Sequence, residues 1–152
     1  MKRTNSFVIA SLVFVSLIAI PGVSYAQAPS AVPALPDYSD WQRSNQINAE
    51  VYLNGRQTTL RLEGYLHTDF ENLMRYSLIL TYNEQGNLWL ADLWEEIGQR
   101  RLDKSIFTIE EHRYIFENID GNWMFVHELS TGDDTNVEAA NFIRERYNLE
   151  FR

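Results

Sequence analysis

The chain has 152 residues, no cysteine and a formal net charge of −8, with 21 acidic residues against 13 Lys and Arg. The lack of cysteine excludes thiol nucleophiles, thiolate metal sites and iron–sulfur clusters, and no disulfide can support the fold. The negative balance argues against nucleic acid and anionic lipid as partners, because both are bound through clustered Lys and Arg.

Residues 1–26 have the layout of a secretory signal peptide. Lys2 and Arg3 precede an apolar run over 7–20, and small residues lead up to Ala26. The run has 14 residues, whereas a membrane-spanning helix needs about 20. We therefore expect cleavage after Ala26, which removes two positive charges and leaves a soluble chain of net charge −10. The expected location is the periplasm, or the thylakoid lumen if the source is photosynthetic.

Proline marks a boundary after the signal peptide. Pro29, Pro33 and Pro36 all lie within 27–37, and no proline follows them. This composition predicts an extended tether over 27–37 and a single globular domain over 38–152. The tether is expected to be a spacer, and the alternative is an arm that docks on a partner.

The globular part opens with a β-hairpin. Asn54-Gly55 is the dipeptide that a two-residue type I′ turn requires, and apolar and polar residues alternate around it over 47–66. Such a turn pairs residue 53 with 56, so that 49 faces 60 and 47 faces 62, and apolar residues oppose apolar residues. Gly64 falls on the apolar face, where it indicates a bulge or a close backbone approach.

A third strand is expected over 73–82. One face of it carries Met74, Tyr76, Leu78, Leu80 and Tyr82. Residues 83–87 form a turn, and 88–97 fit helical spacing as well as a strand. Their position directly after the turn favours a strand over 88–94.

A charged connection over 98–104 leads to a last hairpin, with strands over 105–118 and 123–129 around the turn Asp120-Gly121. If the turn has two residues, the following pairs face each other: Phe116 and Phe125, Tyr114 and His127, and Arg113 and Glu128. Aromatic and opposite-charge pairs of this kind stabilise sheets.

A helix is predicted over 136–147. Thr135 and Glu138 form a T-x-x-E capping box at its start. The stripe expected on the sheet consists of Val137, Ala140, Ile143 and Tyr147, and Leu149 and Phe151 are expected to pack behind it. Six antiparallel strands in hairpin order with this helix predict a β-rich α+β fold, an antiparallel meander sheet or open barrel.

One segment resembles part of a known family. Residues 114–130 (YIFENIDGNWMFVHELS) resemble the closing hairpin of SnoaL-type domains, in which a G-x-W precedes an inward strand. Those domains begin with helices, whereas this globular part begins with a strand hairpin. The resemblance implies a hairpin here, and no functional residue is carried over from it.

The predicted hairpin places His112 and His127 on one face as diagonal neighbours, with Glu110 two residues from His112. Two imidazoles and a carboxylate can hold Zn²⁺ with an open position. No H-E-x-x-H or similar spacing supports a metal. We therefore expect half-exposed sheet histidines, without metal or cofactor.

Asp92 is the candidate general base. On the strand interpretation it shares a face with Leu88, Leu90 and Trp94, and a buried carboxylate with a raised pKa marks a functional site. His127 is the other candidate base. No nucleophile elbow or phosphate loop accompanies them.

Aromatic residues offer a binding site. Tyr76, Tyr82, Trp89 and Trp94 can line a groove for a sugar, a pigment or an apolar ligand, although sheet aromatics more often belong to the core.

The sequence favours an exported, non-enzymatic binding or assembly module that presents a sheet face to a protein partner or a small apolar ligand. Two alternatives stay open. One is a small enzyme with a sheet-lined pocket, and the other is an accessory subunit of an envelope or membrane-bound complex. Only the uncleaved precursor is expected to meet a membrane.

Overall fold

The computed structural model describes residues 31–129 and 134–151. Residues 33–152 form one compact unit, and of the residues before it only 31 and 32 are described. The predicted signal peptide and the first part of the tether thus lie outside the described residues. Within the described ranges, no helix is both long and apolar enough to cross a bilayer.

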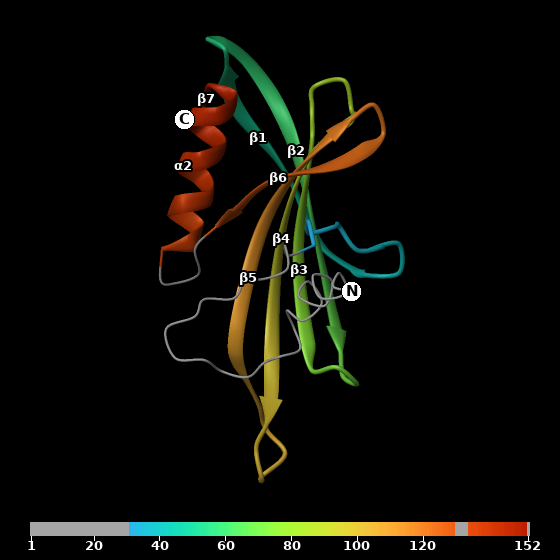
Figure 1. Ribbon diagram of the computed structural model, residues 1–152. Helices are drawn as coiled ribbons and strands as arrows, with labels where there is room; N and C mark the ends of the chain where they lie inside the picture. Colours follow the sequence, from blue (N-terminus) through green and yellow to red (C-terminus); the bar gives the residue numbers. More distant parts are fainter. Residues whose placement is uncertain (1–30, 130–133, 152) are drawn as a thin grey trace, which may run out of the picture. The chain divides into compact units, whose positions relative to one another are not determined.

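Seven strands and one helix make up the described part of the larger unit (Figure 1). They are β1 (Gln42–Leu53), β2 (Arg56–Asp69), β3 (Met74–Tyr82), β4 (Leu88–Arg100), β5 (Ile106–Ile119), β6 (Asn122–Leu129), α2 (Thr135–Tyr147) and β7 (Leu149–Phe151). The strands form one antiparallel sheet in the order β6-β5-β4-β3-β2-β1-β7, curled into a half-barrel. The predicted β-rich meander with a C-terminal helix is confirmed, and β7, which pairs with β1, is an additional strand.

The two predicted hairpin turns are present. Asn54 and Gly55 have φ angles of 52° and 79°, and Asp120 and Gly121 have φ angles of 52° and 88°. Positive φ at both central residues is what a type I′ turn requires. The first hairpin has the predicted register, with residue 53 opposite 56 and 49 opposite 60.

The ambiguous segment is a strand, as predicted, because β4 pairs with β3 on one side and β5 on the other. β4 continues to Arg100, and Gln99 and Arg100 pair with β5. The expected charged connection is therefore shorter than predicted and occupies only 101–105.

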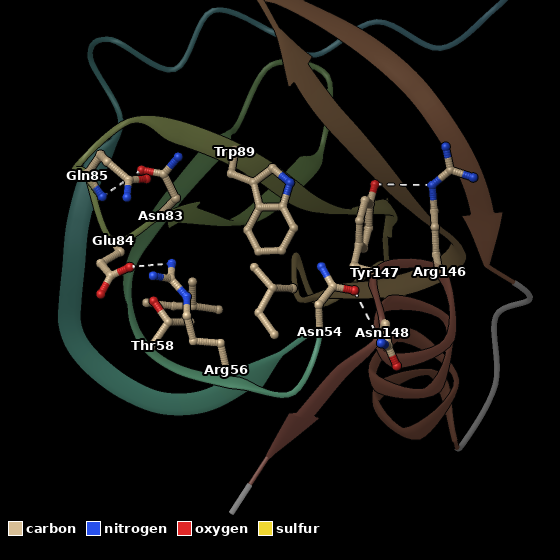
Figure 2. Close-up of a pocket in the computed structure, with 12 residues that line it drawn as sticks. Asn54, Arg56, Thr58, Asn83, Glu84, Gln85, Trp89, Arg146, Tyr147 and Asn148 are labelled. Carbon is tan, nitrogen blue, oxygen red and sulfur yellow. Dashed lines mark hydrogen bonds and ion pairs between the residues drawn. The ribbon is translucent and has the colours of Figure 1, made fainter.

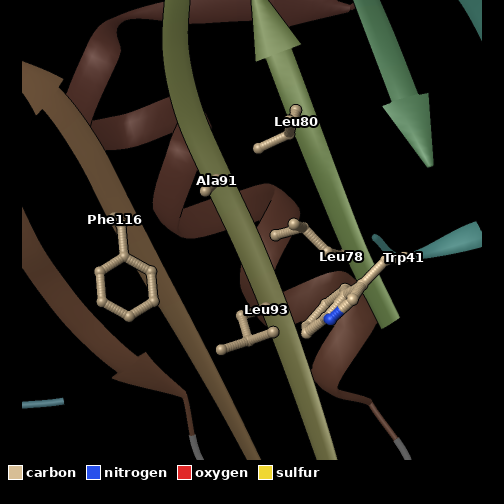
Figure 3. Close-up of a cluster of buried hydrophobic side chains, with 6 residues drawn as sticks. All are labelled: Trp41, Leu78, Leu80, Ala91, Leu93 and Phe116. Atoms are coloured by element: carbon tan, nitrogen blue, oxygen red, sulfur yellow. The ribbon is translucent and has the colours of Figure 1, made fainter. Parts of the chain in front are cut away.

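One face of the sheet, which we call the aromatic face, carries Tyr76, Leu78 and Leu80 of β3 and the residues level with them on the neighbouring strands. Its buried cluster consists of Trp41, Leu78, Leu80, Ala91, Leu93 and Phe116 (Figure 3). Leu35 and Tyr38, which precede β1, pack against this cluster. The segment 35–41 therefore covers part of the aromatic face.

The opposite face, which we call the helix face, carries Ile79, Asp92 and Ile115. Two buried clusters lie on it. In one, Ala139, Phe142 and Ile143 of α2 pack against Val126, Ile115 and Leu129; in the other, Leu149 packs against Val51 and Leu60. The helix thus connects the last strands of the sheet to β7.

The contact stripe of α2 differs from the expected one. Val137 is 57% exposed, whereas Ala139 is buried and Phe142 and Ile143 pack against the sheet. The i, i+3, i+4 spacing of these three residues is that of a helix face turned toward a core. The N-cap is Asp134 rather than Thr135, so the helix begins one residue earlier than predicted.

Four register shifts interrupt the ladders among the described strands. The first lies opposite Gly64, where a Cβ atom would come within 2.5 Å of Ser44 Oγ. This confirms the close approach predicted at Gly64. Each shift inserts a residue that breaks the alternation of side chains between faces.

The shift between Ile115 and Phe116 changes the last hairpin. Phe116 faces Phe125 as predicted, but the extra residue Val126 moves the rest of β6 by one position. His127 therefore faces Ile115 and Glu128 faces Tyr114, and the predicted pairs Tyr114–His127 and Arg113–Glu128 are wrong.

An ion pair within the sheet is hydrogen-bonded to the helix. Arg113 is buried and donates to both carboxylate oxygens of Asp92, at 2.9 and 2.7 Å. Its Nη1 donates to Asn136 Oδ1 of α2 at 2.7 Å. Asp92 is thus the carboxylate partner of a buried arginine that reaches across the sheet–helix interface.

We expect Asp92→Ala to lower the free energy of unfolding by about 3 kcal/mol, because it leaves the charge of Arg113 buried and without its carboxylate. The control is Glu84→Ala, which breaks the exposed Arg56–Glu84 pair at 3.0 Å and should cost less than about 1 kcal/mol. Urea unfolding curves of both variants test this, and equal losses would contradict it.

Candidate functional site

The four aromatic candidates do not share one groove. Tyr76 and Tyr82 lie on the aromatic face and pack against its cluster. Trp89 packs against Val51, Leu60 and Leu149 on the helix face, and Trp94 lies on the same face, level with Arg113. The sheet separates the tyrosines from the tryptophans, so the groove expected between them is not formed.

Trp89 owes its position to a bulge. Thr81 faces Leu90 and Tyr82 faces Leu88, so Trp89 is the residue without an opposite partner. Leu88 packs on the aromatic face, while Trp89 and its successor Leu90 both lie toward the helix face. The ring of Trp89 meets Tyr147 of α2 edge-on, with centroids 5.1 Å apart.

Trp89 borders an open pocket of about 460 Å³, which we call the Trp89 pocket (Figure 2). The β1–β2 turn, the β3–β4 turn, the start of β4 and the C-terminal end of α2 surround it. Its apolar lining consists of Leu53, Leu60, Trp89 and Tyr147. Its volume lies in the usual range for small-molecule sites.

Side-chain amides line the same pocket, and Figure 2 shows them on both sides of Trp89. They are Asn54, Asn83, Gln85 and Asn148. Asn148 ends the helix in the left-handed conformation at φ 50°, and its Nδ2 donates to Asn54 Oδ1 at 3.2 Å. Asn83 Oδ1 accepts from the backbone N–H groups of Gln85 and Asn87, so the turn itself positions these amides.

The charged groups of the pocket are largely paired. Arg56 donates to Glu84 at 3.0 Å, and Arg146 donates to the hydroxyl of Tyr147 at 3.2 Å. The Tyr147 hydroxyl in turn donates to Glu117 at 3.1 Å. Burial raises the pKa of Tyr147, which keeps this hydroxyl protonated and able to donate. Trp89 Nε1 donates to no group among the described residues.

Sequence reasoning selected Trp89 but missed the amides and Tyr147. One signal could have found them. In an antiparallel meander the first and third turns lie at the same end of the sheet, so Asn54 and Asn83 had to be neighbours. The contribution of α2 and Asn148 depends on how the helix returns to β1, which no local pattern specifies.

The two candidate bases do not form a catalytic pair. Both carboxylate oxygens of Asp92 accept hydrogen bonds from Arg113. His127 stacks on Phe142 of α2, with ring centroids 4.2 Å apart and planes 7° from parallel. Asp92 lines a cavity of about 170 Å³ beneath α2 together with Arg113, but His127 does not.

The possible zinc ligands are divided between the two faces. Glu110 and His112 lie on the aromatic face, where His112 Nε2 is 2.6 Å from Glu110 Oε1. His127 lies on the helix face because of the bulge at Val126. The expectation that His112 and His127 share a face is therefore wrong. No group of three potential ligands that could hold a metal occurs among the described residues.

A buried carboxylate on the aromatic face was not anticipated. Glu63 accepts from Arg43 at 2.9 Å and from the Tyr65 hydroxyl at 2.8 Å, and Arg61 lies 3.5 Å away. Burial and the neighbouring Glu63 raise the pKa of Tyr65 to about 12. The alternating pattern of β2 predicts that Glu63 and Tyr65 face solvent. In the structure, the curl of the sheet encloses the face on which they lie.

The comparisons give no relative. No protein-family model, curated protein or solved structure matches the chain. Functional argument therefore rests on the geometry of the described residues.

We expect Glu110→Gln to lower the pKa of His112. The hydrogen bond to Glu110 is the main cause that raises this pKa, and Glu128 contributes as well. The stability that this pair contributes is fully present below about pH 6.5, the pKa of a histidine in the unfolded chain. It is lost as the pH rises through the higher pKa that His112 has in the folded chain. NMR titration of the imidazole protons measures the change, and Glu111→Gln is the control because Glu111 lies on the opposite face. An unchanged His112 titration in E110Q would contradict the assignment.

Proposed function

We propose that this chain is an exported, non-enzymatic binding module and that its ligand is a sugar held in the Trp89 pocket. The observation that carries the proposal is a tryptophan turned into an open pocket by a bulge and surrounded by side-chain amides. A pyranose ring presents C–H groups on its faces and hydroxyls at its edge. The first suit an indole ring, and the second suit amide donors and acceptors.

The mixed lining favours a sugar over the apolar ligand that the sequence also allowed. Apolar ligands are held by mainly apolar walls with few polar groups. In the Trp89 pocket, amides and the Arg56–Glu84 pair alternate with the aromatic rings. The binding site is then the end of the sheet, formed by its turns, rather than a sheet face.

The charged residues support binding rather than hydrolysis. Glycoside hydrolysis commonly uses two carboxyl groups on either side of the bond to be cleaved. Among the described lining residues, Glu84 is the one carboxylate, and Arg56 neutralises it. A paired, surface carboxylate of this kind suits hydrogen bonding to hydroxyls.

The exported location has its own test. If the signal peptide is cleaved as its layout predicts, the protein recovered from an expressing cell begins at Gln27. N-terminal sequencing or intact mass measures this. A chain that retains Met1 and sediments with the membrane fraction would contradict it.

Sugar binding can be tested with soluble neutral oligosaccharides, namely cellotetraose, maltotetraose and chitotriose, by titration calorimetry. We expect at least one of them to bind, and Trp89→Ala to weaken that binding by about tenfold, as expected for loss of an aromatic contact. Gln85→Ala should weaken it by a smaller factor. If none of the three binds, or if W89A binds equally well, the proposal is wrong.

Matched controls separate the pocket from the fold. Trp94→Phe and Gln99→Ala alter the same residue types on β4, outside the pocket, so they should leave affinity unchanged. Trp89→Phe keeps an apolar ring against the Leu60 cluster and distinguishes loss of ligand contact from loss of structure. Circular dichroism spectra of all variants should match that of the unchanged protein.

A further inference from the structure

The β4–β5 hairpin extends beyond the rest of the sheet (Figure 1). β3 begins opposite Ile97, so the part of the hairpin after this residue has no third strand beside it. Gln99 and Arg100 still pair with β5, and the turn occupies 101–105. At about 3.3 Å per strand residue, the tip at Leu102 lies roughly 15 Å beyond the end of β3.

The turn at this tip has several hydrogen bonds among its own polar groups. Arg101 N–H donates to Ser105 O at 2.8 Å, and Lys104 N–H donates to Arg101 O at 2.9 Å. Asp103 accepts from the backbone N–H and the hydroxyl of Ser105, at 2.9 and 2.6 Å. These hydrogen bonds hold Leu102 at the outermost position, where its side chain is fully exposed.

Two residues in this turn depart from what turn stability favours. Lys104 has φ 71°, a conformation in which glycine or asparagine carries less strain. Leu102 is a large apolar side chain that is fully exposed. Departures of this kind from local consistency are expected where a residue serves function rather than folding.

The tip is basic although the chain is acidic. Arg100, Arg101 and Lys104 surround Leu102, and Asp103 is the single acid within 97–109, which gives this hairpin a net charge of +2 against −8 for the chain. No ion pair involves these three cations among the described residues. Arg101 lies over the ring of Phe107, 4.3 Å from its centroid, which directs one cation along the hairpin.

Other apolar side chains at this end of the sheet are exposed as well. Phe70, in the β2–β3 turn, is 70% exposed, and Ile106 and Ile109 on β5 are 44% and 54% exposed. Phe70 and Ile106 border a common pocket of about 280 Å³. The projecting tip therefore stands above a second, broader apolar area.

We propose that the β4–β5 tip docks on an anionic phospholipid surface. Leu102 would enter the level of the acyl chains, while the three cations contact lipid phosphates, an arrangement in which long basic side chains keep their charge in the headgroup layer. The proposal rests on the charge complementarity between the basic tip and an anionic surface, and on the projection of the tip beyond the rest of the sheet. A narrow, convex tip can enter a fluid interface but buries too little area for a stable protein complex, which takes about 1,200–2,000 Å².

The acidic remainder of the domain does not prevent this contact. On the hairpin itself, the carboxylates that follow the tip region are Glu96, which is paired with Arg75, and Glu110. In the β2–β3 turn at the same end of the sheet, Asp69 accepts a hydrogen bond from Asn72, and Glu71 is exposed. Glu96 and Glu110 lie at or behind the level of Ile97, and screening at physiological salt reduces electrostatic interactions over about 8 Å. The tip is thus the part of the domain that an anionic surface can attract.

Because the chain has no cysteine, Leu102→Cys gives a single attachment point for an environment-sensitive fluorophore. The protein recovered from an expressing cell is labelled and mixed with vesicles of phosphatidylcholine alone, or of phosphatidylcholine and phosphatidylglycerol in equal parts. We expect the emission to move to shorter wavelength only with phosphatidylglycerol and to move back at high salt. A label at Val137→Cys, on the exposed side of α2, should not respond.

Charge variants complete the test. Each of Arg100→Gln, Arg101→Gln and Lys104→Gln should raise the lipid concentration for half-maximal response by about fivefold, whereas Arg144→Gln on α2 should not. An equal response to pure phosphatidylcholine, or none to phosphatidylglycerol, overturns the proposal. A response to soluble polyglutamate but not to vesicles also overturns it and points to an acidic protein instead.

Discussion

Strict alternation of side chains between two faces is the constraint on which this sheet depends, and the four register shifts are where it is relaxed. A meander strand sends successive residues to opposite faces, so one inserted residue moves all later side chains to the other face. The shift at Trp89 turns an indole toward the helix face beside α2. The shift at Val126 turns His127 onto Phe142. The contacts of Trp89 and His127 with α2, and the Trp89 pocket itself, thus depend on these two bulges.

Most of the fold follows from local sequence. The Asn-Gly and Asp-Gly dipeptides specify tight turns, and the apolar alternation around Asn54-Gly55 specifies the register of β1 with β2. Gly64 marks the first bulge in the sequence, whereas the other three escape prediction because a single inserted residue leaves the composition unchanged. The errors at Tyr114, His127 and Val137 all follow from this or from the rotation of α2, which is determined by packing against Ile115 and Leu129 rather than by its own pattern.

The candidate site was less predictable than the fold for a related reason. Its residues come from two turns, one strand start and one helix end, and tertiary structure alone brings these together. Glu63 illustrates the same limit, since its position in β2 looks solvent-facing until the curl of the sheet covers that side. The two proposed contact regions lie at opposite ends of one sheet, because alternate turns of a meander point in opposite directions.

The pairing of β7 with β1 has a consequence for how the domain matures. Val51, Tyr52 and Leu53 of β1 pair with Phe151, Glu150 and Leu149, so β7 covers the last three residues of the outer edge of β1. A chain synthesised from its N-terminus can assemble the meander one hairpin at a time, but this part of β1 stays unpaired until residues 149–151 have been translated. Loss of residues 149–151 would leave these three residues of β1 available to pair with another molecule.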